Sequence, residues 1–362
     1  MKTNFKKFPV GTVFNPYSKT LKATPKYKKI VIRYPSRLEA MALDPSKITS
    51  NNNLVYKAGQ IDFCVGIYKT VTIEIVKDGK KNIHIDATSS RKPLILHACI
   101  IMRKALNFSD SLNVKVETDL DLRHCGLGSS SATIASVATA INEIYDLPMS
   151  PIDISRYCAQ NHGEEIKKDH NNLTPVQCLG GSAVCGNFVG GLIVLAGEAT
   201  PIATVSLPKE YHVVIGVPKN FTHPDSELLL KKEEENMDGF SRTGKIYSKT
   251  IAYRMLHDVL PDLAFGNLEK AKNLIFDYRW KMGSIKNCSF VYPPMNDIAS
   301  KLQDYNTSEK FDILSLSSVG PGFFALTRDV NYVSSIFKNV GLETYDAIIH
   351  NEKYIVELKE YE

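Results

Sequence analysis

The pattern of apolar and polar positions predicts both strands and helices, which occur in clusters rather than in strict alternation. Apolar and β-branched runs bounded by turn residues predict strands over residues 30–32, 62–69, 71–76, 112–118, 192–195, 211–217, 313–318 and 323–327, of which the last two should pair. Apolar positions three and four residues apart predict helices over residues 94–106, 134–145, 152–162, 251–259, 268–276 and 295–302. Such clustering favours an α+β fold over a doubly wound parallel sheet.

Two local motifs predict where elements turn or begin. The segment Lys77-Asp78-Gly79-Lys80 separates two strand-like stretches, 71–76 and 82–85, and predicts a β-hairpin. Ser150 followed by Pro151 predicts the start of a helix, because Ser caps a helix N-terminus and Pro fits its first turn.

The chain is expected to divide into three parts. Residues 1–25 show no clear periodicity and are predicted to form an N-terminal arm. Residues 26–205 are assigned to one domain, which carries a glycine-rich loop, and residues 206–362 to a second domain. A chain of 362 residues is long enough to bury a sizeable core in either domain.

Composition excludes several classes of protein. With 43% hydrophobic and 23% charged residues, the chain is neither disordered, collagen-like nor a coiled coil, and no apolar run is long enough to cross a membrane. The 44 Lys and Arg against 39 Asp and Glu give a net charge of +5. The densest Lys cluster, residues 22–29, is assigned to a solvated arm rather than to a nucleic-acid patch. We expect neither a nucleic-acid nor a membrane partner.

The cysteines and the N-terminus favour a cytoplasmic protein. Seven Cys are present without a CxxC pair or the Cys/His spacing of a metal site, and MKTNFKKF lacks the apolar stretch of a signal peptide. We expect reduced, mostly buried thiols. Four potential metal ligands that lie close in sequence are assigned to a solvated helix end, which leaves the metal ligands unknown: His162, Glu164, Glu165 and His170.

A glycine- and serine-rich loop stands between a predicted strand and a long helix. Its glycines allow a tight turn and a close approach of the backbone to a ligand, and the helix offers unpaired N–H groups at its positive end. Such a loop suits phosphate or pyrophosphate, whereas the alternative is a plain glycine turn with a serine cap. The predicted phosphate-binding residues are Gly126, Leu127, Gly128, Ser129, Ser130 and Ser131.

This loop resembles the motif with which members of the GHMP kinase superfamily bind nucleotide phosphates. The stretch Leu316 to Ala325 is similar to the superfamily's third motif, a glycine loop that closes over the same site. Two motifs in the right order are more specific than either alone. The resemblance implies a two-domain α+β fold with a left-handed crossover, and adds Gly320 and Pro321 to the phosphate site.

One residue expected of a GHMP kinase is missing. The kinases normally carry a catalytic Asp about seven residues before a Gly-Gly pair that opens a strand, and with Gly190-Gly191 as that pair the position is Ala183. No carboxylate occurs from Asn171 to Val194. Transfer to a hydroxyl would then lack its usual positioning group, although electrostatic stabilisation alone supports some transfers.

In lacking this catalytic Asp, the chain resembles one branch of the superfamily, the β-ribofuranosylaminobenzene 5′-phosphate synthases and related C-nucleoside synthases. Three segments of the chain are similar to motifs of that family: Tyr34-Pro-Ser-Arg-Leu38 with Asp44, Gly59 to Ile67, and Ser317-Ser318-x-Gly320-Pro321. Glu39 departs from the family, which has His at that position, and this departure puts the identity of the acceptor in question.

The resemblance implies a transferase that joins an aromatic carbon to C1 of phosphoribosyl pyrophosphate (PRPP), with loss of carbon dioxide and pyrophosphate. It implies Mg²⁺ as cofactor, PRPP and an aromatic carboxylic acid as partners, and a homodimer. The implied catalytic residues are Asp62, Asp44 and Arg37, two carboxylates near the ribosyl centre and a cation for the acceptor carboxylate. A surface ion pair for Arg37 and a strand-end cap for Asp62 are the alternatives. The implied acceptor-binding residues are Ser36, Arg37, Glu39, Ser317 and Ser318.

Three functions are therefore weighed. The first is the PRPP-dependent, decarboxylating C-glycoside synthase, the second an ATP-dependent small-molecule kinase of the same superfamily, and the third a non-catalytic ligand-binding protein on the same scaffold. The missing carboxylate near Ala183 disfavours the kinase, while the glycine loops and Arg37 disfavour the non-catalytic protein. The sequence alone favours the synthase, with the kinase as the alternative.

Overall fold

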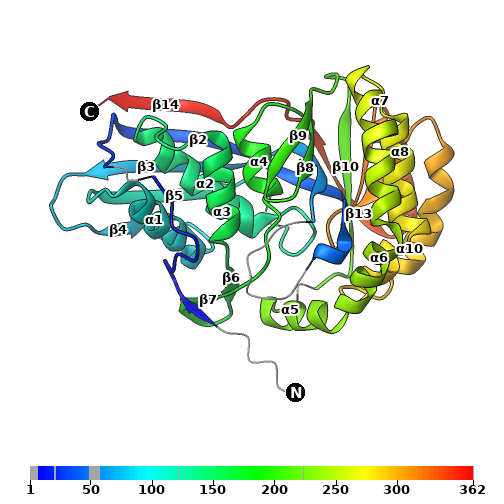
Figure 1. The fold of residues 1–362 in the computed structure, drawn as a ribbon, viewed down its shortest axis with the longest axis horizontal. Helices are drawn as coiled ribbons and strands as arrows, with labels where there is room; N and C mark the ends of the chain where they lie inside the picture. The colour runs from blue at the N-terminus through cyan, green and yellow to red at the C-terminus, as the bar shows by residue number, and fades with distance from the viewer. Residues whose placement is uncertain (1–6, 20–21, 49–57, 121, 223, 362) are drawn as a thin grey trace.

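The chain folds around two main sheets that lie side by side, with helices on their faces (Figure 1). The computed structural model describes residues 7–19, 22–48, 58–120, 122–222 and 224–361. Helices and strands are both abundant, so the predicted α+β class is confirmed.

The first sheet is built on two long strands. β2 (Tyr27–Ala42) and β3 (Gln60–Val76) pair antiparallel along most of their length. Around them the order is β14-β2-β3-β5-β4, and β8 pairs with β3 and β9 with β8. The remaining strands of this sheet are β4 (Ile83–Ile85), β5 (Ser111–Thr118), β8 (Leu192–Ala196), β9 (Thr200–Val205) and β14 (Ile355–Tyr361).

Four helices cover one face of the first sheet (Figure 1). They are α1 (Lys92–Leu106), α2 (Ser129–Ile144), α3 (Pro151–Gln160) and α4 (Gly181–Asn187). α2 lies among the others and is buried from Ala132 to Ile144, because its small Ala, Ser and Thr side chains allow close packing on every side. Its N-terminus, and the glycine loop before it, are therefore held in a fixed place.

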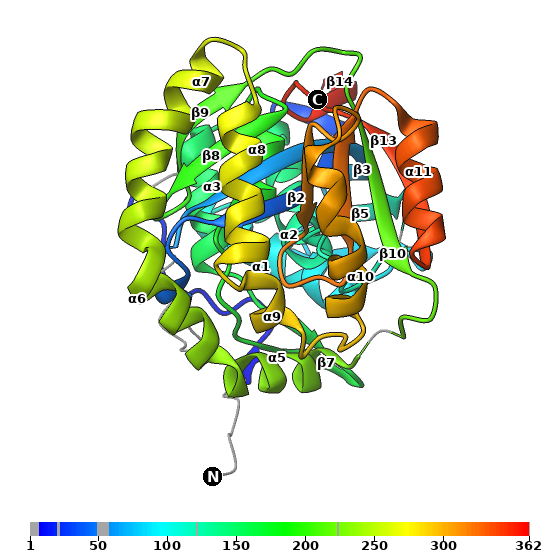
Figure 2. The same ribbon diagram turned by 90° about the vertical axis from the view of Figure 1, so that its right-hand side faces the viewer.

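The second sheet has the order β11-β12-β10-β13, with helices on both sides (Figure 2). Its strands are β10 (His212–Pro218), β11 (Ile313–Leu316), β12 (Phe323–Thr327) and β13 (Leu342–Ile348). The accompanying helices are α6 (Met237–Arg254), α7 (Leu260–Ala264), α8 (Glu269–Phe276), α9 (Ser284–Cys288), α10 (Met295–Leu302) and α11 (Val330–Asn339). Buried Leu38 and Phe63 from the first sheet join a common core with Ile215 and Phe324 from the second.

The described part of the predicted arm packs onto the body. β1 (Phe8–Pro9) pairs with β7 (Asp169–Thr174), which pairs with β6 (Glu164–Ile166) to make a third, small sheet. The side chain of Phe8 is buried, and the Gly11 amide donates to Nδ1 of His97 at 2.9 Å. This part of the predicted N-terminal arm therefore packs against β7 and α1, through the Phe8 side chain and the Gly11 amide.

Most predicted elements are confirmed, but the predicted hairpin is wrong. β4 pairs with β5, and in parallel, so the chain after β3 does not fold back on it. β5 arrives after α1 and takes the place beside β3. The segment 77–80 is therefore a loop that passes over a neighbouring strand, although its turn residues are typical of a hairpin.

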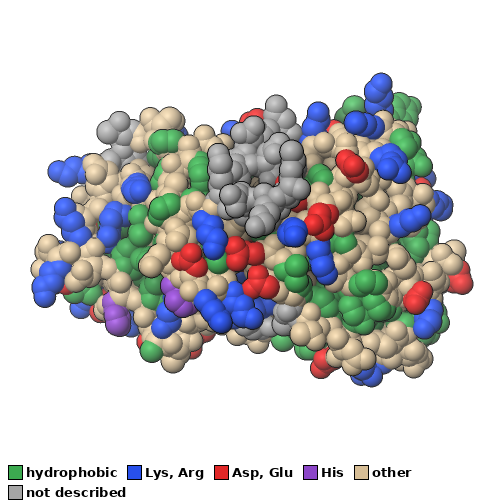
Figure 3. Space-filling view, turned by 90° about the horizontal axis from the view of Figure 1, so that it is seen from below, with side chains coloured by type: hydrophobic (Ala, Val, Ile, Leu, Met, Phe, Trp, Pro, Cys, Tyr) green, Lys and Arg blue, Asp and Glu red, His purple; other side chains and the backbone are tan. Residues whose placement is uncertain are grey.

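The face seen in Figure 3 carries Lys and Arg side chains interspersed with Asp and Glu. Among the residues coloured there, no extended basic surface of the kind that binds nucleic acid is present. In the described parts of the chain, no helix is long and apolar enough to cross a membrane.

A buried arginine ties the two sheets together. Arg279 lies in the π-helix η3 (Asp277–Lys281) and is 1% exposed. Its guanidinium donates to the carbonyls of Ala40 (2.7 Å) and Glu39 (3.1 Å) at the end of β2. It also donates to the Ser318 carbonyl at 2.9 Å, in the glycine-rich loop between β11 and β12. One side chain thus fixes β2 against that loop.

We expect Arg279→Met to lower the free energy of unfolding by about 3–5 kcal/mol, because the substitution leaves buried carbonyls without donors. Urea denaturation followed by circular dichroism measures the change. The matched control is Arg242→Met, which alters an exposed side chain on α6. Equal stability of the two variants would contradict the assigned role of Arg279.

Candidate active site

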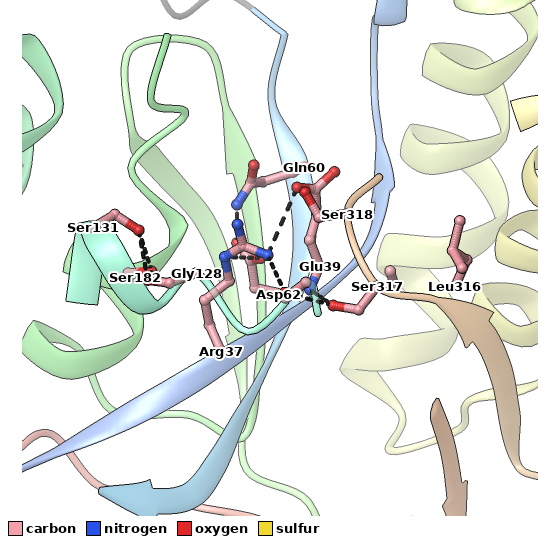
Figure 4. A network of polar contacts seen from close by, with 12 residues as sticks. Arg37, Glu39, Gln60, Asp62, Gly128, Ser131, Ser182, Leu316, Ser317 and Ser318 are labelled. Carbon is pink, nitrogen blue, oxygen red and sulfur yellow. Dashed lines mark hydrogen bonds and ion pairs between the residues drawn. The ribbon is translucent and has the colours of Figure 1, made fainter. Parts of the chain in front are cut away.

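A cavity of about 250 Å³ lies where the two sheets meet. Its walls come from β2, β3, the segment 175–182, helix α5 (Ser226–Glu235), and two loops. We call residues 126–131 the first glycine loop and residues 317–322 the second glycine loop. Figure 4 shows the polar network that joins β2, β3, Ser182 and the two glycine loops.

The two glycine loops interlock. Gly126 and Gly128 have φ angles of 88° and 64°, in the left-handed region that favours glycine. A Cβ atom on Gly126 would collide with the Ser317 carbonyl, and the Ser317 hydroxyl donates to the Gly126 carbonyl at 2.8 Å. Glycine is therefore required at position 126 for both its conformation and its lack of a side chain.

Each serine of the first glycine loop has a different partner. The Ser129 hydroxyl accepts from Arg91 at 3.2 Å, Ser130 contacts the Glu164 carboxylate, and Ser131 lies 2.7 Å from the Ser182 hydroxyl. All three sit in the first turn of α2, where backbone N–H groups lack intrahelical partners. The site combines helix amides, hydroxyls and one carboxylate, a set suited to an anion together with a divalent cation.

Glu164 is held as a buried anion. Arg91 donates to Glu164 and to Glu165, each at 2.7 Å. Burial alone would raise the pKa of Glu164, but Arg91 and the Ser130 hydroxyl hold it below its ordinary value. The assignment of these acids to a solvated helix end is wrong, because they lie in and beside β6 against the first glycine loop. No cluster of three or more His, Cys, Asp or Glu metal ligands occurs among the described residues.

A second ionic group lies on β2 and β3 beside the loop. The Arg37 Nη1 atom donates to the Gly126 carbonyl at 3.1 Å and lies 3.8 Å from Glu39, and its Nε lies 3.9 Å from Asp62 (Figure 4). Asp62 is fully buried and accepts from the Gln60 amide at 2.5 Å. Burial raises the pKa of Asp62 to about 7, against the opposing effect of Arg37.

Most of the predicted site residues border the cavity. Those in its lining are Arg37, Glu39, Gly126, Leu127, Gly128, Ser129, Ser130, Ser131, Ser318 and Gly320. Asp62 lies behind the wall, in contact with Arg37 and Gln60. Ser36, Ser317 and Pro321 belong to the same strand and loop but are outside the lining.

Asp44 does not reach the cavity. Its carboxylate accepts from the Ser46 amide at 3.1 Å and the Ser46 hydroxyl at 2.6 Å, and so caps the short 3₁₀ helix η1 (Pro45–Lys47). This geometry does not support a catalytic role for Asp44, because its carboxylate is the N-terminal cap of η1.

Sequence reasoning missed several charged groups of the site. Glu233 lines the cavity from α5 and Arg279 from η3, and Arg91 lines it from the position just before α1. Burial raises the pKa of Glu233 to about 7, and the charge of Glu39 adds to the shift. The run of charged residues in α5 is typical of a solvated helix face, and no pattern in the sequence singles out Glu233.

The comparisons with known proteins support the superfamily prediction. A family model described as the GHMP kinases N terminal domain matches residues 93–181, which include α1, the first glycine loop and α2. A homoserine kinase from Methanococcus vannielii is 22% identical over 228 residues, which are 62% of this chain and 65% of that protein. The chain thus spans slightly less than two thirds of this relative's length.

Solved structures show the same fold. A homoserine kinase from Cytophaga hutchinsonii has a TM-score of 0.56 at 14% identity and covers 94% of this chain and 100% of its own. A structure described as MDDEF in complex with MVAPP, AMPPCP and magnesium has a TM-score of 0.58 at 11% identity, covering 91% and 99%. The chain has a GHMP-kinase-like fold.

These matches overturn the predicted chemistry. The expectation of a PRPP-dependent transferase that acts on an aromatic carboxylic acid in C-nucleoside synthesis is wrong, because the relatives that match are named kinases that act on a small molecule. The matches support an enzyme and agree with the alternative, an ATP-dependent kinase. Mg²⁺ as cofactor is consistent with the magnesium named for the related structure.

We expect Gly126→Ala to weaken binding of Mg²⁺–ATP at least about tenfold, because the added Cβ drives the two loops apart. Isothermal titration calorimetry measures the affinity. Gly341→Ala is the matched control, since Gly341 has a similar φ of 93° but open space around it. If both variants bind equally well, the interlocking of the loops does not matter for the ligand.

Asp62 should make stability depend on pH. With a pKa of about 7 in the folded protein and about 3.8 in the unfolded chain, folded Asp62 keeps a proton that the unfolded chain has lost. The contribution of Asp62 to the free energy of unfolding therefore falls as pH rises from about 4 to 7. Urea denaturation across this range should show a smaller loss of stability for Asp62→Asn than for the wild type, and identical pH profiles would contradict the assigned pKa.

Proposed function

We propose that this protein is an ATP-dependent kinase that phosphorylates a hydroxyl group of a small molecule. The observation that carries the proposal is the first glycine loop at the N-terminus of α2, where Ser130 contacts Glu164 at the wall of a cavity. Homoserine, the substrate named for the relatives, is a first compound to assay.

The phosphate groups of ATP would lie at the start of α2. Free N–H groups and the positive end of the helix dipole favour an anion there. The glycines allow the backbone to approach it, and the second glycine loop limits how far the first can move. A rigid anion site of this kind places the terminal phosphoryl group without reorganisation during the reaction.

Ser130 and Glu164 would hold Mg²⁺. The donor set of one hydroxyl and one carboxylate suits this ion, which is usually bound by one or two carboxylates together with substrate phosphates. The carboxylate is already ionised, because the pKa of Glu164 is lowered by Arg91 and Ser130 against the effect of burial. When bound, Mg²⁺ neutralises charge on the phosphate oxygens.

In the reaction, the acceptor oxygen forms a bond to the γ-phosphorus while the bond from that phosphorus to the β,γ-bridging oxygen breaks. ADP leaves, and the hydroxyl proton passes to solvent or to a cavity carboxylate. Because such a transition state is loose, positioning and charge stabilisation contribute most of the catalysis. Arg37, which lines the cavity next to Gly128, is suited to stabilise the transferred group.

Asp62 replaces in space the carboxylate that is missing in sequence. A Cβ on Gly181 would collide with the Gln60 and Asp62 side chains, so this β3 carboxylate lies directly beneath the segment that lacks an acid. Since Asp62 is fully buried and Arg37 is not, Asp62 acts as a positioning residue that orients Arg37.

The test is a coupled assay of ADP formation with Mg²⁺–ATP and a panel of small hydroxyl compounds that includes homoserine. We expect turnover with at least one acceptor, and a loss of about 100-fold or more in kcat/KM for Glu164→Gln, because Mg²⁺ loses its carboxylate ligand. Glu117→Gln, an exposed site on β5, is the control. Absence of both turnover and Mg²⁺–ATP binding would refute the proposal.

A further inference from the structure

The wall of the cavity that β2 and α5 form is acidic. Glu39 from β2 and Glu233 and Glu234 from α5 line it, and Asp62 lies just behind. Glu39 is close enough to Asp62 and Glu233 that its charge adds to the burial that raises both of their pKa values. Three carboxylates from separate elements, Glu39, Asp62 and Glu233, therefore lie close to one another, beside Arg37 and Arg279.

A buried hydrogen-bond acceptor also lies there without a partner. Gln60 lines the cavity with 1% of its surface exposed, and its Nε2 is engaged by Asp62. Its Oε1 is buried and has no hydrogen-bond partner among the described residues (Figure 4). An unsatisfied buried acceptor is costly, so its persistence in a cavity wall indicates a ligand that donates a hydrogen bond.

Each arginine of the cavity already contacts acids or carbonyls. Arg37 donates to the Gly126 carbonyl and lies within 4 Å of Glu39 and Asp62, and Arg91 is bound by two glutamates. Arg279 donates to backbone carbonyls and serine hydroxyls. Among the described residues, no lysine lines the cavity. A carboxylate on the acceptor would find acids in place of an unengaged cation.

We propose that the acceptor is an amino alcohol without a carboxylate, whose ammonium group binds between Gln60 Oε1, Glu39 and Glu233. This inference rests on the proposed kinase function and narrows its substrate class. An ammonium group supplies the donor that Gln60 lacks and neutralises the surplus negative charge. Its hydroxyl end is then left to face the phosphoryl group at the first glycine loop.

Matched pairs of small alcohols test the proposal in the full-length protein with Mg²⁺–ATP. 2-Aminoethanol is compared with 3-hydroxypropionate, 3-aminopropan-1-ol with 4-hydroxybutyrate, and homoserine carries both charged groups. We expect kcat/KM to favour the amine over the acid at least about tenfold in each pair, and 3-aminopropan-1-ol to exceed homoserine. Binding is also measured by calorimetry with an unreactive ATP analogue, so that a slow reaction does not hide it.

A variant on α5 separates the ammonium site from general damage. Glu233→Gln should lower the affinity for the preferred amine about tenfold and leave Mg²⁺–ATP binding unchanged. The control is Glu235→Gln on the same helix, whose side chain is exposed and pairs with Lys231. Both properties should stay unchanged in that control.

Two results would overturn the inference. One is a preference for the acid of each pair, or for homoserine over its amine analogue; the other is binding of no amine, or equal amine binding by wild type and Glu233→Gln. The kinase proposal itself would survive any of these if another alcohol were phosphorylated. Only a protein that neither binds Mg²⁺–ATP nor forms ADP would refute both.

Discussion

The buried guanidinium of Arg279 is the constraint on which the cavity depends. It donates to the backbone carbonyls of Glu39 and Ala40 in β2 and of Ser318 in the second glycine loop. If either segment shifted, the buried guanidinium would lose hydrogen-bond acceptors. A charge buried among carbonyl dipoles is stable only while those dipoles stay in place. The second loop in turn holds Gly126, which precedes the α2 N-terminus. The backbone of β2 and the two glycine loops are therefore positioned by the hydrogen bonds of one side chain.

The charges around the cavity are arranged differently from what the net charge of +5 suggests. A surplus of cations would be expected to serve an anionic substrate, yet the three lining arginines are balanced by four lining glutamates: Glu39, Glu164, Glu233 and Glu234. At the first glycine loop the cavity offers helix amides and Ser130 with Glu164, whereas the wall formed by β2 and α5 is acidic. The basic surplus of the chain therefore lies outside the lining of the cavity.

Features set by neighbouring residues were predictable from sequence, and features set by distant ones were not. The glycines at 126 and 128 adopt left-handed angles, and Ser150 caps α3 through the Asp153 amide, because both depend on local backbone chemistry. The predicted hairpin between β3 and β4 is wrong because β5, which follows α1 in the chain, lies between these two strands. Asp62 under Gly181 and Glu164 against Ser130 are brought together only by the packed sheet. The spacing of these residues along the sequence does not predict that they lie in contact.

The pairing of β14 with β2 has a consequence for how the protein is made. β14 follows the whole second sheet in the chain, yet it covers the edge of the first sheet, where Tyr354 and Lys359 reach the buried carboxylate of Glu143 in α2. On the ribosome, β2 therefore waits with an open edge while every later element is translated. The first sheet cannot be completed by the first half of the chain, and Glu143, in the helix that follows the first glycine loop, lacks these two partners until synthesis has passed residue 359.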